Sequence, residues 1–289
     1  MKVRIIANPI AGGGRGKRLA EALRDTLNGN VDAVELVLTK QAGDNEIEAA
    51  RPGADCVVAV GGDGSVNEVV NGLVDSDALL AILPAGTANV VARELDIPSD
   101  PNVVAKYIIA GNHRIMDAGL HGGRRFLLGG GAGLDAAIVH QVSQQRGKKS
   151  GLSKWVMPSI RTCLRYTFPQ FRVVGDGRIL AEDAQYVIVG NCRYSAGVFP
   201  ATPKAQIDDG LLDVCVLRNL SPLRLLGLLP SVRVGRHIDR DDVLYRQCEH
   251  VELIPADEQD IPLQIDGDPR ELLPATFSVE PGAIRVITG

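Results

Sequence analysis

Gly61-Gly62-Asp63-Gly64-Ser65 separates two segments of different periodicity. The run before it, 55–60, is apolar and β-branched, as in a buried strand, whereas the apolar residues of 66–73 recur at helical spacing. The glycines therefore mark a turn from a strand into a helix. Backbone N–H groups and the positive end of a helix dipole bind phosphate at such a turn, and Asp63 beside a polyphosphate needs a bridging cation such as Mg²⁺. The alternative is a tight turn in which Asp63 only caps the helix.

The composition is that of an ordinary globular protein. A length of 289 residues favours two domains, and a net charge of −4 argues against a nucleic-acid partner. The cysteines are odd in number, scattered and without a Cys-x-x-Cys pair, which predicts reduced thiols in a cytoplasmic protein; they are Cys56, Cys163, Cys192, Cys215 and Cys248. No signal peptide and no apolar run of ~18 residues is found, so we expect any membrane contact to be peripheral, at the inner face.

The first third of the chain alternates strand and helix patterns. Strands are expected at 3–7, 34–38, 57–60 and 79–83, with helices at 17–27, 45–50 and after the glycine turn. This alternation predicts a Rossmann-like parallel α/β domain over 1–117, its sheet covered on both faces. A ligand then binds at the carboxyl ends of the strands. Those ends carry Asn8-Pro9, Thr39, Gly61 to Ser65, and Pro84 to Asn89.

The glycine-rich loop 8–18 does not match the familiar phosphate loops. A Walker A motif needs glycine and Ser or Thr where Ala11 and Arg18 stand, and a dinucleotide fingerprint needs glycine at Lys17. A flexible glycine loop remains, with Arg15, Lys17 and Arg18 suited to a polyphosphate. A solvated basic helix start is the alternative for each of these side chains.

From about residue 112 the pattern changes to short strands. They are expected at 126–128, 171–174, 185–189, 212–217, 251–254 and 262–265, with helices at 150–165 and 222–234. This composition predicts a second domain rich in antiparallel β structure over 118–283. A last strand at 284–287 is compatible with either domain, so that 284–289 is a candidate to return to the first.

Three further segments combine glycine with polar or acidic residues. Pro84 to Asn89 follows a strand, and Thr87 and Asn89 are suited to contact a nucleotide, although Thr87 as an ordinary helix cap is the alternative. Segments 205–214 and 264–269 carry clustered aspartates at strand ends, for which hairpin turns are the alternative. Because no Ser-His constellation accompanies these turns, they favour metal-assisted phosphoryl transfer.

These motifs resemble the diacylglycerol kinase catalytic-domain superfamily, in its bacterial soluble lipid-kinase branch, which is similar to sphingosine kinases. The Gly-Asp-Gly core also occurs in NAD kinases and phosphofructokinases, whereas Gly86 to Asn89 and Asp266-Gly267-Asp268 separate the lipid kinases from them. The matching segments follow the family's order over nearly the whole chain: Asn8-Pro9 with its glycine loop, Thr39, Gly61 to Leu73, Pro84 to Asn89, Asp209 to Asp213, and Asp266 to Asp268.

The resemblance implies an N-terminal nucleotide domain and a C-terminal β-sandwich-like domain, with ATP and lipid meeting in the cleft between them. Asp266 is then the general base and Asp63 a catalytic Mg²⁺ ligand. Asp209 with the carbonyl of Leu211 matches a second, structural metal position. Asp268 stands where glutamate is usual and Ser65 where threonine is usual; Asp268 is expected at the metal and the phosphates. The expected ATP-binding residues are Asn8, Thr39, Gly61, Gly62, Gly64, Ser65, Asn67, Glu68, Gly86, Thr87, Asn89 and Asp268.

The expected function is therefore transfer of the ATP γ-phosphate to the hydroxyl of diacylglycerol, phosphatidylglycerol or a sphingoid-type lipid, with ATP and Mg²⁺ required. The alternatives are an NAD kinase-like enzyme with a soluble acceptor and a non-catalytic nucleotide-binding regulator. Membrane contact is expected around Lys148, Lys149, Lys154 and Trp155, for which a solvated loop is the alternative. The leucines of 223–229 suit a lipid-facing groove, but core packing is preferred. A homodimer is left open.

Overall fold

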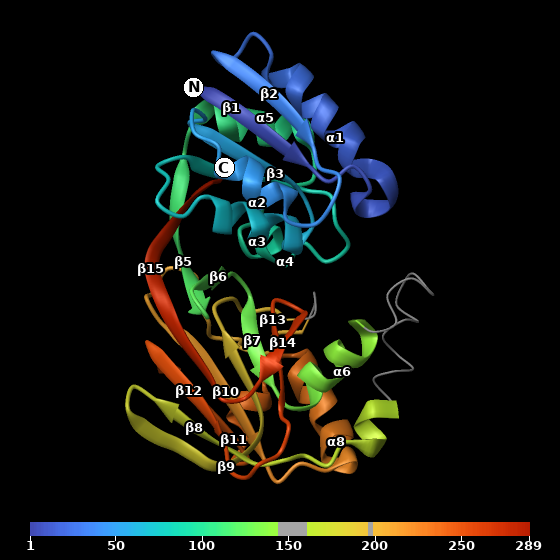
Figure 1. Cartoon of the computed structure of the whole chain (residues 1–289), viewed down its shortest axis with the longest axis vertical. Helices are drawn as coiled ribbons and strands as arrows, with labels where there is room; N and C mark the ends of the chain where they lie inside the picture. Colours follow the sequence, from blue (N-terminus) through green and yellow to red (C-terminus); the bar gives the residue numbers. More distant parts are fainter. Residues whose placement is uncertain (144–160, 196–198) are drawn as a thin grey trace. The chain divides into compact units, whose positions relative to one another are not determined.

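A computed structural model describes residues 1–143, 161–195 and 199–289 (Figure 1). The chain divides into two compact units, Met1–Ala118 with Pro281–Gly289, and Gly119–Glu280. The first boundary lies one residue after the expected residue 117, and the second lies three residues before the expected residue 283. Two strands, β5 (His113–His121) and β15 (Ala275–Ile287), contribute residues to both units.

The first unit contains a parallel sheet in the order β4-β3-β1-β2. Its strands are β1 (Lys2–Ala7), β2 (Ala33–Leu38), β3 (Cys56–Gly61) and β4 (Leu79–Pro84). The end of β15 pairs in parallel with β4 through Val286 and Leu80, so the last strand of the chain extends this sheet. Every residue of β3 is buried, which explains its continuous apolar run. The expected parallel α/β fold is confirmed.

Helices pack against this sheet as two pairs, α1 with α5 and α2 with α3 (Figure 1). Their bounds are α1 (Ala11–Leu27), α2 (Asp44–Ala49), α3 (Asp63–Gly72), α4 (Val90–Glu94) and α5 (Pro101–Ala110). Three glycines, 12–14, take left-handed conformations within α1, so regular helix begins close to the expected residue 17. The sequence interpretation missed α5, although Asp100 caps it and Gly111 ends it in the left-handed conformation.

The second unit is built on antiparallel pairings, as expected. The strands run in the order β14-β13-β7-β9-β8-β12-β15, and β10 pairs with β9 and β11. The unit's further strands are β6 (Arg124–Phe126), β7 (Gly129–Ala132), β8 (Phe171–Gly175), β9 (Arg178–Gly190), β10 (Leu212–Arg218), β11 (Val243–Cys248), β12 (His250–Pro255), β13 (Pro262–Ile265) and β14 (Asp268–Leu272). The main core of this unit includes Phe126, Phe171 and Phe277.

A second hydrophobic cluster packs beneath the helices α6 (Leu134–Ser143) and α8 (Pro222–Arg233) and the 3₁₀ helix η1 (His237–Asp239). The sequence interpretation missed α6. Of the helix expected at 150–165, residues 161–165 are helical and the rest lie outside the described residues. Core packing is wrong for three leucines of α8, because Leu223, Leu226 and Leu229 are exposed and only Leu228 is buried there.

All five cysteines are free thiols, as expected. Within the described ranges, no helix combines the length and apolar character needed to span a bilayer.

Candidate active site

Three loops meet at the carboxyl ends of the parallel strands in the first unit. The backbone N–H groups of Ala85 and Gly86 both donate to the Gly61 carbonyl oxygen, at 2.8 and 3.1 Å. A Cβ added to Gly86 lies only 2.5 Å from the Cα of Gly62, and one added to Gly12 lies 2.1 Å from the Ala85 carbonyl oxygen. Glycine is therefore required where these loops touch, and the expected strand ends do come together.

The central glycine turn leaves an open helix start. Helix α3 begins at Asp63, and its first-turn N–H groups have no partner within the helix. Ser65 is buried, and its hydroxyl would stand 2.3 Å from a Cβ at Gly61. Gly64, in contrast, is exposed, and a Cβ there meets no atom within 4 Å. The turn is thus closely packed on one side and accessible at Gly64, where an anion can approach the helix.

Asp63 faces the loop that follows β4. Its Oδ1 accepts a hydrogen bond from the Val91 N–H at 3.2 Å, and burial raises the pKa of its carboxyl group. Asn89 closes the same loop: its Oδ1 accepts from the Gly86 N–H at 2.9 Å, and its Nδ2 donates to the Gly86 carbonyl oxygen at 3.1 Å. The N-cap position of α4 is Asn89, so the interpretation of Thr87 as the helix cap is wrong; Thr87 is exposed.

Several of the residues predicted to contact the nucleotide make hydrogen bonds to the protein's own loops. The Thr39 hydroxyl is buried and donates to the Ala7 carbonyl oxygen at 3.3 Å. Asn8 accepts from the N–H of Ile10 through its Oδ1. The Glu68 carboxylate accepts from the Gly43 N–H at 3.0 Å and from the Asn45 amide at 2.7 Å, so it holds the loop after β2.

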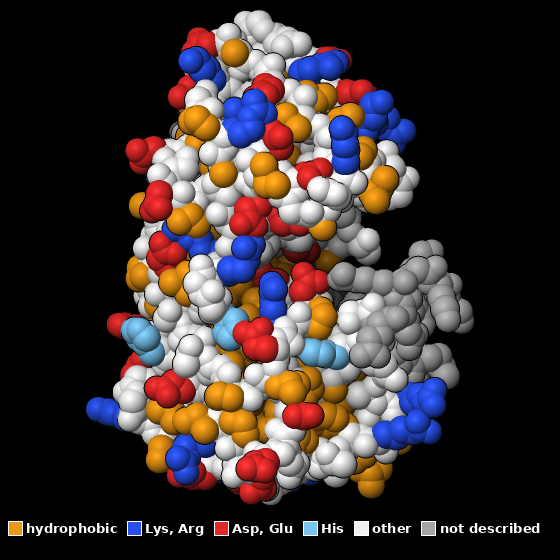
Figure 2. All heavy atoms as spheres, viewed as in Figure 1, with side chains coloured by type: hydrophobic (Ala, Val, Ile, Leu, Met, Phe, Trp, Pro, Cys, Tyr) orange, Lys and Arg blue, Asp and Glu red, His pale blue; other side chains and the backbone are white. Residues whose placement is uncertain are grey.

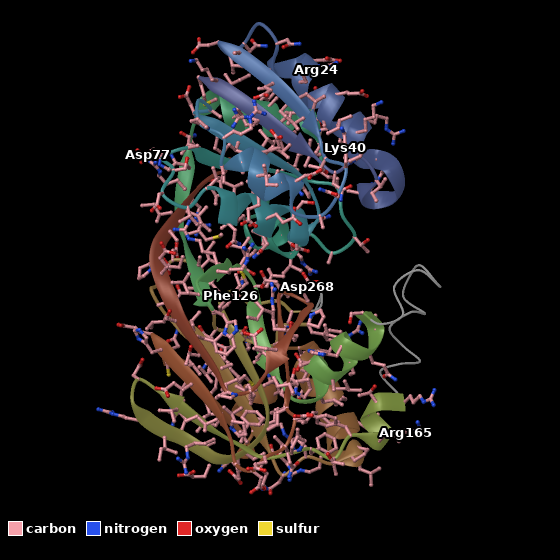
Figure 3. The ribbon with its side chains drawn as sticks, in the orientation of Figure 1. Arg24, Lys40, Asp77, Phe126, Arg165 and Asp268 are labelled. Atoms are coloured by element: carbon pink, nitrogen blue, oxygen red, sulfur yellow. The ribbon has the colours of Figure 1, made fainter. Side chains whose placement is uncertain are left out.

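Basic side chains stand near the same edge of the sheet. Arg15, Lys17 and Arg18 are exposed, and Arg15 also donates to the Gly12 carbonyl oxygen at 3.2 Å. Figure 3 shows Lys40, which follows β2, at the carboxyl ends of the strands. The sequence interpretation did not select Lys40. Asn67 lies on α3, where its carbonyl oxygen accepts from the amide of Asn71 at 2.9 Å.

In the second unit, Asp266 occupies the turn between β13 and β14 with a positive φ of 52°. Its Oδ2 accepts from the Leu127 N–H at 2.9 Å, and its Oδ1 accepts from the N–H groups of Leu128 and Gly129 at 2.9 and 3.1 Å. Hydrogen bonds of this kind stabilise a carboxylate charge and fix its orientation. Asp268 begins β14 and is exposed near the tip of this hairpin (Figure 3).

A further carboxyl group, Asp135, was missed by the sequence interpretation. Its Oδ2 accepts from the Gln264 amide at 3.1 Å, and burial raises its pKa to about 6. The Gln264 Oε1 accepts in turn from the Gly267 N–H at 2.9 Å, which ties Asp135 to the turn that carries Asp266. From the sequence alone, Asp135 is indistinguishable from an ordinary acid in a first helical turn.

The aspartates of segment 205–214 form a compact acidic group. Asp209 accepts from the Leu211 N–H at 3.1 Å and from the Gln247 amide at 3.0 Å, and Gln247 also donates to Asp213 at 3.3 Å. Asp213 is fully buried, and burial raises its pKa while hydrogen bonds from the Tyr245 hydroxyl and the Gln247 amide act in the opposite direction. Carboxylate oxygens grouped in this way are ligands of the kind that hard cations bind. No group of three or more His, Cys, Asp or Glu side chains suited to a metal occurs in the described part of the chain, so a cation here also needs backbone oxygens such as that of Leu211, or water.

The four residues expected at the membrane, Lys148, Lys149, Lys154 and Trp155, lie outside the described residues. Their role stays a prediction.

Comparison with known proteins identifies the family. Residues 2–121 match the diacylglycerol kinase catalytic domain, and residues 131–288 match the YegS C-terminal NAD kinase beta sandwich-like domain. A diacylglycerol kinase of Mycobacterium tuberculosis is 30% identical over 298 residues, covering 99% of this chain and 94% of the relative. The chain belongs to the diacylglycerol kinase family.

Other relatives agree with this family. A diacylglycerol kinase of Staphylococcus carnosus is 25% identical, covering 96% of this chain and 91% of its own, and a Pseudomonas aeruginosa protein named "Probable lipid kinase YegS-like" is 31% identical, covering 83% and 78%. The solved structure of a Bacillus anthracis diacylglycerol kinase has a TM-score of 0.75 and 23% identity, covering 100% of this chain and 97% of that one, which shows the fold. The expected family and the expected lipid kinase class are confirmed.

Proposed function

We propose that this member of the family transfers the γ-phosphate of ATP to the hydroxyl group of a lipid, in a reaction that depends on Mg²⁺. Diacylglycerol is the acceptor named for its relatives, and phosphatidylglycerol and sphingoid-type lipids are the other candidates. One observation carries the proposal. The Gly61–Ser65 turn, the Gly86 loop and the Gly12 loop meet at one edge of the sheet, within the segment that matches the catalytic domain.

The nucleotide is proposed to bind at this edge. The first turn of α3 supplies N–H donors, and the open position at Gly64 admits a phosphate oxygen close to the backbone. Gly86 and Asn89 hold the neighbouring loop, and Thr39 and Glu68 act indirectly by holding the loop after β2. Asp63 is the proposed ligand of Mg²⁺; one carboxylate suffices because this ion keeps several waters and binds phosphate oxygens.

The carboxylate of Asp266 is proposed as the general base. Three backbone N–H groups orient it, and its low proton affinity relative to an alcohol means that the proton leaves the lipid hydroxyl late, as the new P–O bond forms. When bound, Mg²⁺ offsets the charge on the phosphates. Asp268 is proposed to contact the metal or phosphate from the same hairpin. Asp209, the Leu211 carbonyl and Asp213 are proposed to hold a second, structural cation.

Two other functions stay in competition. An NAD kinase-like reaction with a soluble acceptor is favoured by one observation, the match of residues 131–288 to an NAD kinase beta sandwich-like domain. A nucleotide-binding regulator without turnover would need the glycine loops for binding, but it would not need Asp63, Asp209 and Asp266 for catalysis.

One assay separates the three functions. Purified protein, γ-labelled ATP and Mg²⁺ are offered diacylglycerol, phosphatidylglycerol, sphingosine, ceramide and NAD in parallel. We expect label in an extracted lipid, and its loss in Asp63→Asn but not in Asp257→Asn, an exposed acid of the second unit. Label on NAD supports the soluble-acceptor reaction, and ATP binding without transfer to any acceptor supports the regulator.

A further inference from the structure

Helix α8 carries apolar side chains both toward the core and toward solvent. Leu225, Leu228 and Val232 pack against the hydrophobic cluster beneath the helix. Leu223, Leu226 and Leu229 are instead 81%, 62% and 54% exposed, and Val234 just beyond the helix is 63% exposed. A surface helix normally turns polar residues to water. The outward leucines of α8 therefore have no role in the core of this chain.

A short helical segment, 161–165, adds to this surface. Cys163 in this segment and Tyr166 just after it pack against the same hydrophobic cluster as α8, so both segments border that cluster. Leu164 is 70% exposed. We call Leu164, Leu223, Leu226, Leu229 and Val234 the α8 face. Three of these five side chains, Leu223, Leu226 and Leu229, stand on one helix, and several exposed apolar side chains on one element mark a contact site rather than scattered surface variation.

The charge around the α8 face is positive, although the whole chain has a net charge of −4. Residues 161–165 and 222–233 contain four arginines and no acidic residue: Arg161, Arg165, Arg224 and Arg233. Arg224 pairs with Asp242 at 2.6 Å, whereas the other three are exposed, and Figure 3 shows Arg165 directed away from the ribbon. Figure 2 shows Lys and Arg side chains at the lower right edge of the same view. The nearest acids in sequence after α8 are Asp239, Asp241 and Asp242.

We propose that the α8 face docks on an anionic lipid bilayer, with its leucines in the interfacial region and its arginines among the headgroups. Leucines beside arginines are the composition of an interfacial helix, because apolar burial and attraction to anionic lipid act together. This proposal rests on the proposed function, since a lipid kinase must reach a substrate that resides in a bilayer.

A second copy of the chain fits the α8 face less well. A symmetric dimer places the same patch on both partners, so the arginines of one copy approach those of the other. An anionic lipid surface has the opposite charge and avoids this repulsion.

Vesicle sedimentation tests the proposal directly. The double variant Leu223→Ser/Leu226→Ser removes two outward leucines, and Ile109→Ser/Ile179→Ser is the matched control, with side chains 46% and 56% exposed elsewhere. We expect the parent to sediment with phosphatidylcholine vesicles that contain phosphatidylglycerol far more than with phosphatidylcholine alone. The double variant should partition at least about tenfold less onto the anionic vesicles, and the control should match the parent. Unchanged melting temperatures establish that both variants fold.

Two further measurements separate the docking from the enzymatic proposal. Phosphorylation of diacylglycerol in vesicles should fall in the double variant, while phosphorylation of a short-chain, dispersed diacylglycerol stays at the parental rate. If no lipid is phosphorylated by any form, the proposed function fails, and sedimentation still decides the docking. Equal sedimentation of variant and parent overturns the proposal. So does sedimentation velocity that shows a dimer of the parent that the double variant dissociates.

Discussion

Replacing Asp266 by asparagine should destabilise the second unit as well as remove a base. The two carboxylate oxygens accept three backbone N–H groups, from Leu127, Leu128 and Gly129. The best asparagine orientation keeps its oxygen toward Leu128 and Gly129 and turns its NH₂ against the Leu127 N–H. One buried donor then loses its acceptor and faces another donor, which costs about 1–3 kcal/mol. The melting temperature of this unit should fall by roughly 2–12 °C.

Calorimetry of the parent, Asp266→Asn and Asp268→Asn provides the comparison. Asp268 is exposed in the same hairpin, so its substitution should change the stability by about 0.5 kcal/mol or less. If Asp266→Asn melts with the parent, the three hydrogen bonds contribute nothing to stability and the reasoning is refuted. Lipid phosphorylation is measured well below the transition, where the variant is folded. A parental rate there would make Asp266 a structural residue and not the base.

Three other predictions follow from the same contacts. Gly86→Ala places a Cβ 2.5 Å from the Cα of Gly62 and should weaken ATP binding at least about tenfold in titration calorimetry; parental affinity contradicts the loop contact. Burial raises the pKa of Asp135 from 3.8 to about 6, so its contribution to stability is full below pH 3.8 and is lost as the pH rises through 6. The melting temperature of Asp135→Asn relative to the parent should therefore increase between about pH 4 and pH 6, and a constant difference contradicts the shift. Mg²⁺ should raise the melting temperature of the parent more than that of Asp209→Asn, and an equal rise in both argues against the second cation.

The parallel strands could be predicted from the sequence because each is a short run rich in apolar residues, and β1, β3 and β4 are almost entirely buried. Strand β7 could not, since its residues are Gly-Gly-Gly-Ala and carry no β signal. Its glycines are required by contacts with residues that are distant in the sequence. A Cβ at Gly130 would stand 2.4 Å from the Phe277 ring, and β7 pairs with β9 and β13. The exposed leucines of α8 were wrongly assigned to the core for a related reason. Apolar residues at helical spacing predict an apolar helix face, but the spacing does not show whether another part of the chain covers that face.

The positions of the site residues could be predicted better than their contacts. The sequence predicts Gly61, Gly62 and Gly86 as ATP-binding residues, and their mutual approach across two loops comes from the parallel sheet. Glu68 was selected as a nucleotide contact, yet its carboxylate holds Gly43 and Asn45. Such contacts join residues that are far apart in the chain, so spacing alone does not reveal them.

The substitution Gly64→Ala tests the central claim, that a triphosphate lies against the strand-end glycines. Its added methyl group meets no protein atom within 4 Å, and the backbone there is not in the left-handed region. Within helix α3 the change should stabilise the fold by up to about 1 kcal/mol. Gly227→Ala in α8 is the matched control, since it also meets no atom. Titration with ATP and Mg²⁺ should show an affinity at least about tenfold lower for Gly64→Ala, at equal or higher melting temperature, and parental affinity for the control. Parental affinity in Gly64→Ala would mean that ATP binds elsewhere.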